Sequence, residues 1–484
     1  MSPKSDQPTE LPEARDAAPG SMLELLRVAV PLVLSAGSLS LMSAVDRILL
    51  TGYSADALAA VTPGSMLHWT VVCIPMGTIL YANTFISQFD GAGLPNRMAS
   101  SLWQAIWLAI VCGLLMVALL PYSRMVFEVS GQPSAVISEG SVYFNTLCAG
   151  SSILLLSIAL SCYFSGRRRT SVVMYVNMLG VVVNFVLDYL LIYGVGPFPE
   201  LGIRGAAIAT LIARCGDIII YCFLIHRSVR RTNFPLLAHW RPNFELLAKY
   251  FRYGFPSGLH YFVDNSGFTI FLLMIGNLGR DALASTNLAF SVNGLIFVPL
   301  LGFGTAIQTI VGHHLGAGLP DAASKTTWNA VKLGIGWTGV TSLLLLTIPE
   351  VALMPFSAFA QERPAAAAAL DELTPSVILL LRFVAFYSVF DALAVIFSSA
   401  LRGAGDTVYP MLLTMGSSWL IMVVPAWYLS RQPTTTLPLL WWTCALHISF
   451  AGTAMFVRFQ TGRWKRIHLV DCAAPESGST ATSD

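Results

Sequence analysis

The chain has 484 residues, of which 55% are hydrophobic and only 11% are charged, and its mean hydropathy is +0.67. Soluble domains carry about 25% charged residues, so this composition excludes a water-soluble globular protein. A net charge of +2 offers no basic surface for nucleic acid. The eight cysteines are scattered and form no Cys-x-x-Cys pair, which argues against a zinc site or a disulfide framework.

The first residues, 1–20, are polar and proline-rich and lack the apolar core of a signal peptide, so they predict a disordered cytoplasmic tail. Apolar segments of about 20 residues, long enough to cross about 30 Å of hydrocarbon, then recur along the chain. The predicted spans are 23–49, 57–87, 99–121, 138–164, 170–194, 203–226, 250–277, 283–312, 327–348, 375–401, 408–430 and 437–458. A basic connector at 227–249 separates the sixth span from the seventh, and a second cytoplasmic tail is predicted at 461–484.

Basic residues are distributed unevenly between alternate loops. One set of loops carries Arg97, Arg167, Arg168, Arg169, Arg227, Arg230, Arg231, Arg241, Lys249, Arg252, Lys325, Arg402, Arg463, Lys465 and Arg466. The opposite loops are poor in Lys and Arg, and the longest of them, 349–374, is acidic. By the positive-inside rule, both termini and 227–249 are predicted to be cytoplasmic and 349–374 extracytoplasmic.

The two halves of the sequence repeat each other. Asp56-Ala-Leu-Ala recurs as Asp281-Ala-Leu-Ala, and Gly91-Ala-Gly-Leu-Pro recurs as Gly316-Ala-Gly-Leu-Pro, each 225 residues later. The fold class predicted is an all-α integral membrane protein of about twelve transmembrane helices. They form two six-helix repeats, 21–226 and 250–460, with a central cleft between them. Repeats related by an axis along the membrane normal are typical of transporters, with the ligand path between the halves.

A few acids lie inside the predicted spans, where a charge costs about 2.5–3.5 kcal/mol on insertion scales. Asn184 and Asp188 are four residues apart and therefore share one helix face. Asp264 and Asp391 have no basic residue within one helical turn. The acid and amide oxygens of Asp188 and Asn184 suit a proton or a hard monovalent cation, and Asp264 and Asp391 are the next candidates.

Other polar residues have a structural interpretation. Asp46 lies near the outer end of the first span, where a solvated helix-end charge is an alternative to a functional acid. Arg214 and Asp217 are three residues apart and predict a neutralising structural pair.

With these residues in view, the sequence resembles the multidrug and toxic compound extrusion (MATE) transporters over 20–460. The resemblance is carried by Ala44-Val45-Asp46, Gly91-Ala-Gly93, Asn184-Phe-Val-Leu-Asp188, Leu201-Gly-Ile-Arg-Gly-Ala-Ala-Ile-Ala-Thr210, Gly254-Phe-Pro256 and Leu401-Arg-Gly403…Gly405-Asp-Thr407. It implies two V-shaped halves that alternate access and expel small organic, often cationic, compounds in exchange for H⁺ or Na⁺. No catalytic residue and no cofactor besides the coupling ion is implied. We expect a monomer in the bacterial inner membrane.

By position, the resemblance assigns Asp46, Asn184, Asp188 and Thr210 to the cation-coupling site, which is a possible Na⁺ site, and Asp264 and Asp391 to substrate or a further ion. The chain departs from the family pattern at two places. Many bacterial members have Glu at the position of Asp264. The first-half loop reads Gly166-Arg-Arg-Arg-Thr170, and we expect this loop to face solvent and to affect orientation rather than transport.

The repeat equivalents of Asp46, Asn184 and Asp188 are Phe271, Ile421 and Pro425, so coupling is expected mainly in the first half. Two other functions remain as alternatives. A lipid-linked oligosaccharide flippase of related fold would need a cluster of basic residues for pyrophosphate, whereas the charges within these spans are mostly acidic. A membrane-embedded enzyme is less favoured because the sequence has no His-Glu-x-x-His or Gly-x-Ser-x-Gly motif. The same oxygens serve either H⁺ or Na⁺, so the coupling ion stays open.

Overall fold

The computed structural model describes residues 17–129, 134–232, 236–361, 364–467 and 469. Within these residues every regular element is a helix. Most of the two predicted tails, 1–16 and 468 with 470–484, lies outside the described residues.

The first half contains helices that coincide with the first six predicted spans. They are α1 (Met22–Tyr53), α2 (Ala55–Leu80), α3 (Ala82–Gly91), α4 (Pro95–Val117), η2 (Leu120–Tyr122), α5 (Ser123–Val129), α6 (Ser134–Ala149), α7 (Ser151–Gly166), α8 (Thr170–Tyr193) and α9 (Gly202–Thr232).

The connector and the second half follow. The connector contains η3 (Leu237–His239) and α10 (Phe244–Lys249), and the second half contains η4 (Tyr250–Gly254), α11 (Phe255–Gly276), α12 (Arg280–Gly316), α13 (Pro320–Thr347), α14 (Pro349–Gln361), α15 (Pro364–Ala404), α16 (Val408–Ser417), η5 (Ser418–Val423), α17 (Val424–Leu429), α18 (Leu437–Gln460) and η6 (Arg463–Arg466). The segment 349–374, which we predicted as a loop, contains α14 and the start of α15 instead.

Ten helical segments of the described residues are long and apolar enough to cross a membrane. The pair α6 and α7, bent by 48° at Gly150, makes an eleventh span. The predicted seventh span corresponds to α11, whose 22 residues include His260, Asp264 and Asn265. These polar residues lower its mean hydropathy. We therefore assign α11 as a membrane span because it lies at the predicted seventh span, not because of its composition.

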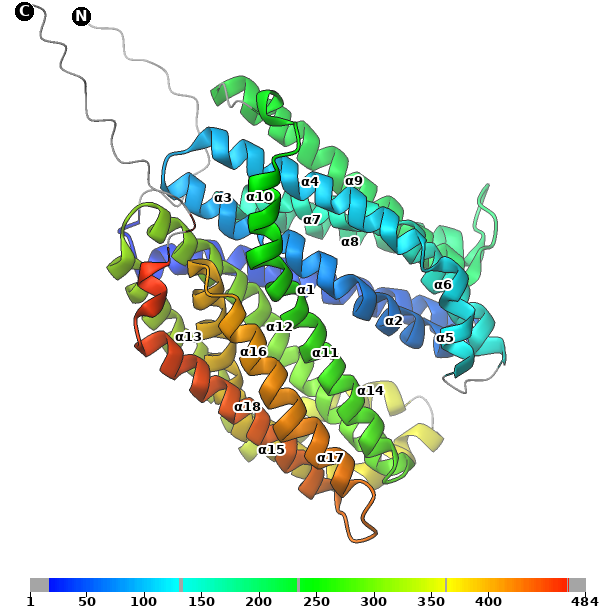
Figure 1. Cartoon of the computed structure of the whole chain (residues 1–484). Helices are drawn as coiled ribbons and strands as arrows, with labels where there is room; N and C mark the ends of the chain where they lie inside the picture. Colours follow the sequence, from blue (N-terminus) through cyan, green and yellow to red (C-terminus); the bar gives the residue numbers. More distant parts are fainter. Residues whose placement is uncertain (1–16, 130–133, 233–235, 362–363, 468, 470–484) are drawn as a thin grey trace, which may run out of the picture.

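Figure 1 shows the two halves as two bundles that meet at one end and diverge toward the other. We call the end where α1 begins and α18 ends the base, and the opposite end, where α5 and α17 lie, the splayed end. Local signals support the helix ends. The Ser21 hydroxyl accepts a hydrogen bond from the Glu24 amide at the start of α1 (3.2 Å), and Gly194 closes α8 in the left-handed conformation.

Small residues let the two halves approach closely and symmetrically. A methyl group on Gly77 of α2 would lie 2.5 Å from the Cα of Gly258 on α11. A methyl group on Gly302 of α12 would lie 2.6 Å from the Cα of Val33 on α1. Gly302 and Gly258 follow Gly77 and Val33 by 225 residues, so the sequence repeat is also a repeat of contacts. Small residues at helix interfaces permit such close packing within a membrane.

Candidate functional site

The polar residues predicted in the first half converge on one place between α1, α8 and α9. Asp46, Asn184 and Asp188 are buried, with exposed fractions of 6%, 0% and 0%. The Asn184 amide donates a hydrogen bond to the Thr210 hydroxyl (3.4 Å), and the charges of Asp46 and Asp188 interact directly. All four predicted residues therefore lie together, and we call them the first-half cluster.

The oxygens of this cluster are poorly satisfied. Oδ1 of Asp46, Oδ1 of Asn184 and both carboxylate oxygens of Asp188 are buried and have no hydrogen-bond partner within the described residues. Burying a polar atom without a partner costs about 1–3 kcal/mol, and more for a charged group. A proton on one carboxyl group or a small cation bound between the oxygens would remove this cost, so the oxygen set fits either a proton or a small cation.

The cluster lies nearer the splayed end than the base. Asp46 precedes the end of α1 at Tyr53 by seven residues, and Asp188 precedes the end of α8 at Tyr193 by five. The phenol of the buried Tyr143, on α6, lies within electrostatic range of both acids. Sequence reasoning missed Tyr143 because a tyrosine in an apolar helix is most often a packing residue.

Arg214 and Asp217 form the buried structural pair that their spacing predicted. The guanidinium Nη1 of Arg214 donates to a carboxylate oxygen of Asp217 at 2.9 Å, and the side chains are 10% and 2% exposed. A second guanidinium nitrogen of Arg214 contacts the sulfur of Met42 on α1.

In the second half, Asp264 of α11 and Asp391 of α15 are half-buried and interact electrostatically with each other. The neighbouring Asn265 donates a hydrogen bond across to Thr70 of α2 (3.3 Å), so this part of α11 faces the first half. Among the described residues, no hydrogen bond or ion pair links these two acids to the first-half cluster. The structure thus holds the acids in two separate groups, one in each half.

Arg402 is placed differently from our expectation. We counted it among the cytoplasmic loop residues, but it lies in the last turn of α15 and is only 6% exposed. Its guanidinium lies 5.1 Å from the ring centre of Tyr261 and donates to the Ser399 hydroxyl. Its charge acts on Asp264, while two of its nitrogens have no hydrogen-bond partner within the described residues.

The base holds the two halves together through a symmetric pair of hydrogen bonds. Asn83 of α3 donates to Thr309 of α12 at 2.7 Å, and Gln308 of α12 donates to Thr84 of α3 at 2.6 Å. The residues exchange places under the 225-residue repeat, since 83 and 84 become 308 and 309. All four side chains are buried, so the base is closed to solvent at this point.

Beside these hydrogen bonds, Glu24 of α1 contacts three other segments of the chain. Its carboxylate accepts hydrogen bonds from the Gly20 amide (2.8 Å) and from Arg168 (3.0 Å), and lies 3.1 Å from the His314 ring nitrogen of α12. Our expectation of a solvent-facing loop at 166–170 was therefore wrong. Arg168 is 14% exposed, and Arg167, 11% exposed, pairs with Asp90 at 3.5 Å. Ion pairs at the junction of the halves hold this loop in place.

Known proteins resemble the chain over nearly its whole length. A family model described as MatE matches residues 31–190 and 256–428. A probable multidrug resistance protein NorM from Xanthomonas campestris pv. campestris is 29% identical over 81% of this chain and 83% of its own length. A probable multidrug resistance protein NorM from Thermotoga maritima is 26% identical over 94% of both chains.

Two solved structures share the fold. A MOP superfamily transporter from Pyrococcus furiosus superposes with a TM-score of 0.83 at 19% identity, covering 94% of this chain and 98% of that one. A structure described as the outward-facing conformation of a multidrug resistance MATE family transporter gives a TM-score of 0.81 at 20% identity, covering 92% and 97%.

Proposed function

Because this chain belongs to the MatE family of membrane transporters, we propose that it is a multidrug efflux antiporter that exports small organic, often cationic, compounds in exchange for H⁺ or Na⁺. The relatives are named as probable multidrug resistance proteins, and one solved structure is described as a multidrug resistance transporter. The coupling ion is a transported substrate, and comparing a pH gradient with a Na⁺ gradient identifies it.

The observation that carries the proposal is the first-half cluster. Two carboxyl groups and one amide face each other in the bundle, and four of their oxygens have no hydrogen-bond partner within the described residues. A carboxyl group in apolar surroundings holds its proton more tightly than a hydrated one. A conformational change that alters the hydration of Asp46 and Asp188 therefore changes their affinity for a cation, which links ion binding to the direction the transporter faces.

The closed base supports a direction of exchange in which the ion enters from the splayed end. The symmetric bonds of Asn83 and Gln308 hold the halves together at the base, while the first-half cluster lies toward the splayed end. We propose that the base is the cytoplasmic end, with both termini cytoplasmic, and that the coupling ion enters from the splayed side. Binding of this ion favours release of the exported compound.

The second-half acids are proposed to act on the charge of the substrate. Asp264 and Asp391 are half-buried and lie on helices α11 and α15, and α11 contacts the first half through Asn265. An organic cation near them gains several kcal/mol of Coulomb energy before desolvation is counted. Aromatic and methionine side chains are proposed to line the rest of the path between the halves, since such surfaces accept many ligands.

The test is transport in inverted membrane vesicles that contain the protein. Uptake of ethidium, a fluorescent organic cation, is measured with a pH gradient alone and with a Na⁺ gradient alone. We expect one gradient to drive uptake and the Asp188→Asn protein, present at the same level, to show none. Vesicles in which neither gradient moves ethidium, although the protein is folded and abundant, would contradict the proposal.

A further inference from the structure

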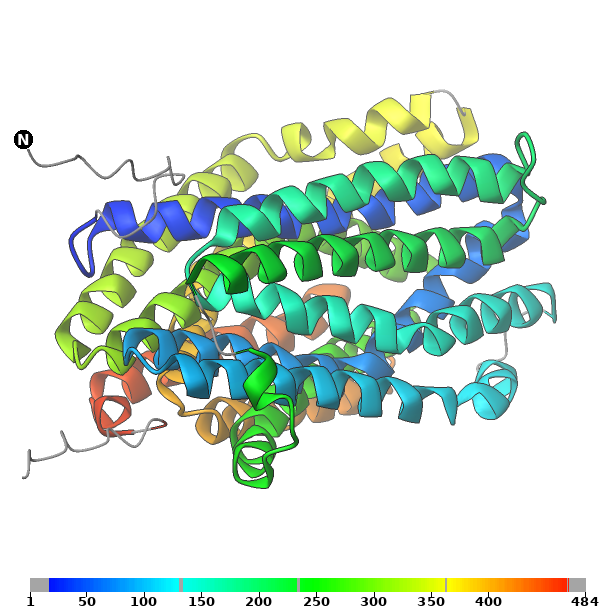
Figure 2. The ribbon, with the colours of Figure 1, turned by 90° about the horizontal axis from the view of Figure 1, so that it is seen from above.

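A groove on the first half lies away from the second half. It has a volume of about 550 Å³ and runs between α9 and the bent pair α6 and α7. The 48° bend at Gly150 turns α6 away from the direction of α7 and leaves this space beside α9. Figure 2 shows α8, α9 and α7 side by side on the face opposite the second half, so the groove faces the surrounding membrane.

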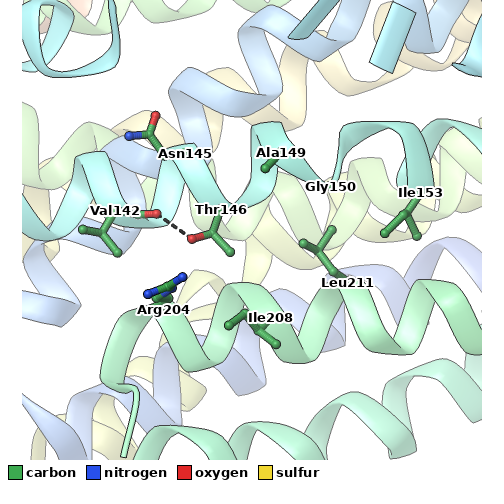
Figure 3. A pocket seen from close by; sticks show the side chains of 9 residues that line it. All are labelled: Val142, Asn145, Thr146, Ala149, Gly150, Ile153, Arg204, Ile208 and Leu211. Atoms are coloured by element: carbon green, nitrogen blue, oxygen red, sulfur yellow. Dashed lines mark hydrogen bonds between the residues drawn. The ribbon is translucent and has the colours of Figure 1, made fainter. Parts of the chain in front are cut away.

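The groove is apolar along its length and charged at one end. Val142 of α6, Ile153 of α7, and Ile208 and Leu211 of α9 line it, and the hydroxyl of Thr146 is bonded within its own helix to the Val142 carbonyl at 2.8 Å. Figure 3 shows the guanidinium of Arg204 beside Val142 and Thr146, at the end of the groove where α9 begins. Ile208 and Leu211 follow Arg204 over about 10 Å of helix toward the membrane interior.

Arg204 is exposed, and no hydrogen bond or ion pair joins it to another residue of the described part of the chain. It stands two residues from the start of α9, at the splayed end of the bundle, where lipid headgroups meet a membrane-spanning helix. A guanidinium binds a phosphate with paired hydrogen bonds, so an exposed arginine at this depth suits the phosphate of a lipid headgroup.

We propose that this groove is a binding site for an anionic phospholipid. The phosphate pairs with Arg204, and an acyl chain lies along Val142, Ile208 and Leu211 between α6 and α9. The charge selects anionic over zwitterionic headgroups, and the groove selects a bound chain over the mobile lipid around the protein. Occupation of the site joins α9, which carries Thr210 of the first-half cluster, to the bent pair α6 and α7.

The site is tested by binding, independently of transport. The purified protein is delipidated in detergent and titrated with dioleoyl-phosphatidylglycerol or dioleoyl-phosphatidylcholine, and retained lipid is counted by native mass spectrometry. We expect phosphatidylglycerol to bind at least tenfold more tightly than phosphatidylcholine. Arg204→Ala should remove this preference, and Arg204→Lys should keep part of it, which shows that charge rather than misfolding is responsible.

Two further variants complete the experiment. Arg280→Ala removes an exposed arginine at the splayed end of α12, outside the groove, and should leave the preference unchanged. Ile208→Trp fills the groove and should lower phosphatidylglycerol binding although Arg204 is intact. Equal retention of the two lipids by the unmodified protein, or unchanged binding in Arg204→Ala or in Ile208→Trp, would overturn the proposal and leave only non-specific lipid around the bundle.

Discussion

At the scale of the residue, the buried acids of the first half differ in what neutralises them. Asp217 has a guanidinium of Arg214 at 2.9 Å, whereas both oxygens of Asp188 have no hydrogen-bond partner within the described residues. A permanently paired acid has no capacity left for a transported ion. The unpaired acid has that capacity, and until an ion binds, nothing offsets the desolvation free energy of its buried charge.

The Asp217→Asn variant should therefore lose stability rather than coupling. Removing one partner of a buried ion pair strands the other charge and costs about 3–5 kcal/mol. Thermal unfolding in detergent, followed by fluorescence-detected size exclusion, measures the loss. The double variant Arg214→Leu/Asp217→Leu should recover most of it, and Glu245→Gln, at an exposed pair, should change little. An Asp217→Asn protein of normal stability that cannot couple transport would reverse our assignment.

The acids of the two halves should also differ in their effect on substrates. Asp264→Asn removes a charge from the proposed substrate path and should slow efflux of a cationic compound about tenfold, the effect of about 1.4 kcal/mol, while a neutral compound is little affected. Asp46→Asn removes part of the proposed coupling site and should slow both compounds alike. Efflux rates of one cationic and one neutral substrate are compared in cells with equal protein levels. Equal losses for both substrates in both variants would show one shared network of acids.

At the scale of the element, hydrophobic length predicted the helices well because it is a local property of the sequence. All predicted spans coincide with helices. Two members of the first-half cluster were predictable from spacing, since Asn184 and Asp188 share a helix face, whereas Asp46 and Thr210 were assigned to it from the family resemblance. The burial of Arg402 and Arg168 was not predictable, because a basic residue near a helix end has the same local signal whether it meets water or another helix. Glu24, which pairs with Arg168, and Tyr261, which lies under Arg402, are far away in the sequence.

The helices meet at the base through glycines that have no room for a side chain. A methyl group on Gly316 of α12 would clash with the carbonyl oxygen of Gln88, and one on its repeat equivalent Gly91 would clash with the carbonyl oxygen of His313. Overpacking that destabilises the closed base by about 1 kcal/mol raises the ratio of open to closed protein about fivefold. Gly316→Ala should therefore open the base.

Opening is measured with a single cysteine at Ala306, which is fully buried in α12, in a cysteine-free background. A hydrophilic maleimide should label Ala306→Cys about fivefold faster in Gly316→Ala than in the parent. Gly336→Ala, where the added methyl group meets nothing within 4 Å, is the matched control and should leave the rate unchanged. Identical labelling in all three proteins would mean that the base is not closed by this contact.

At the scale of the whole molecule, the scaffold is symmetric and the polar residues are not. The close contacts of Gly77 and Gly302 repeat between the halves, whereas the repeat equivalent of Asp46 is the fully buried Phe271. In the proposed mechanism, the two similar bundles exchange which end is closed. Within the described residues, buried carboxylate oxygens without a hydrogen-bond partner occur only in the first bundle. We therefore propose that the symmetric scaffold permits the conformational change, and that the asymmetric polar residues couple it to an ion.

The orientation of the molecule is predicted from its basic residues and is tested by labelling. Leu237 of η3, 74% exposed, lies in the connector just before α10, and the exposed Glu350 lies at the start of α14. Figure 1 shows α10 nearer the base and α14 toward the splayed end. On intact cells, a membrane-impermeant maleimide should label Glu350→Cys and leave Leu237→Cys unlabelled until the membrane is permeabilised. The reverse pattern would invert the proposed topology.

The central claim is that the first-half cluster couples the movement of an ion to that of an organic compound. The most direct measurement loads proteoliposomes with an organic cation and follows H⁺ and ²²Na⁺ as the compound leaves down its own gradient. The account predicts uphill movement of one of these ions in the opposite direction with the unmodified protein, and none with Asp188→Asn. Ion movement that persists in Asp188→Asn, or efflux by the unmodified protein without any opposing ion movement, would contradict it.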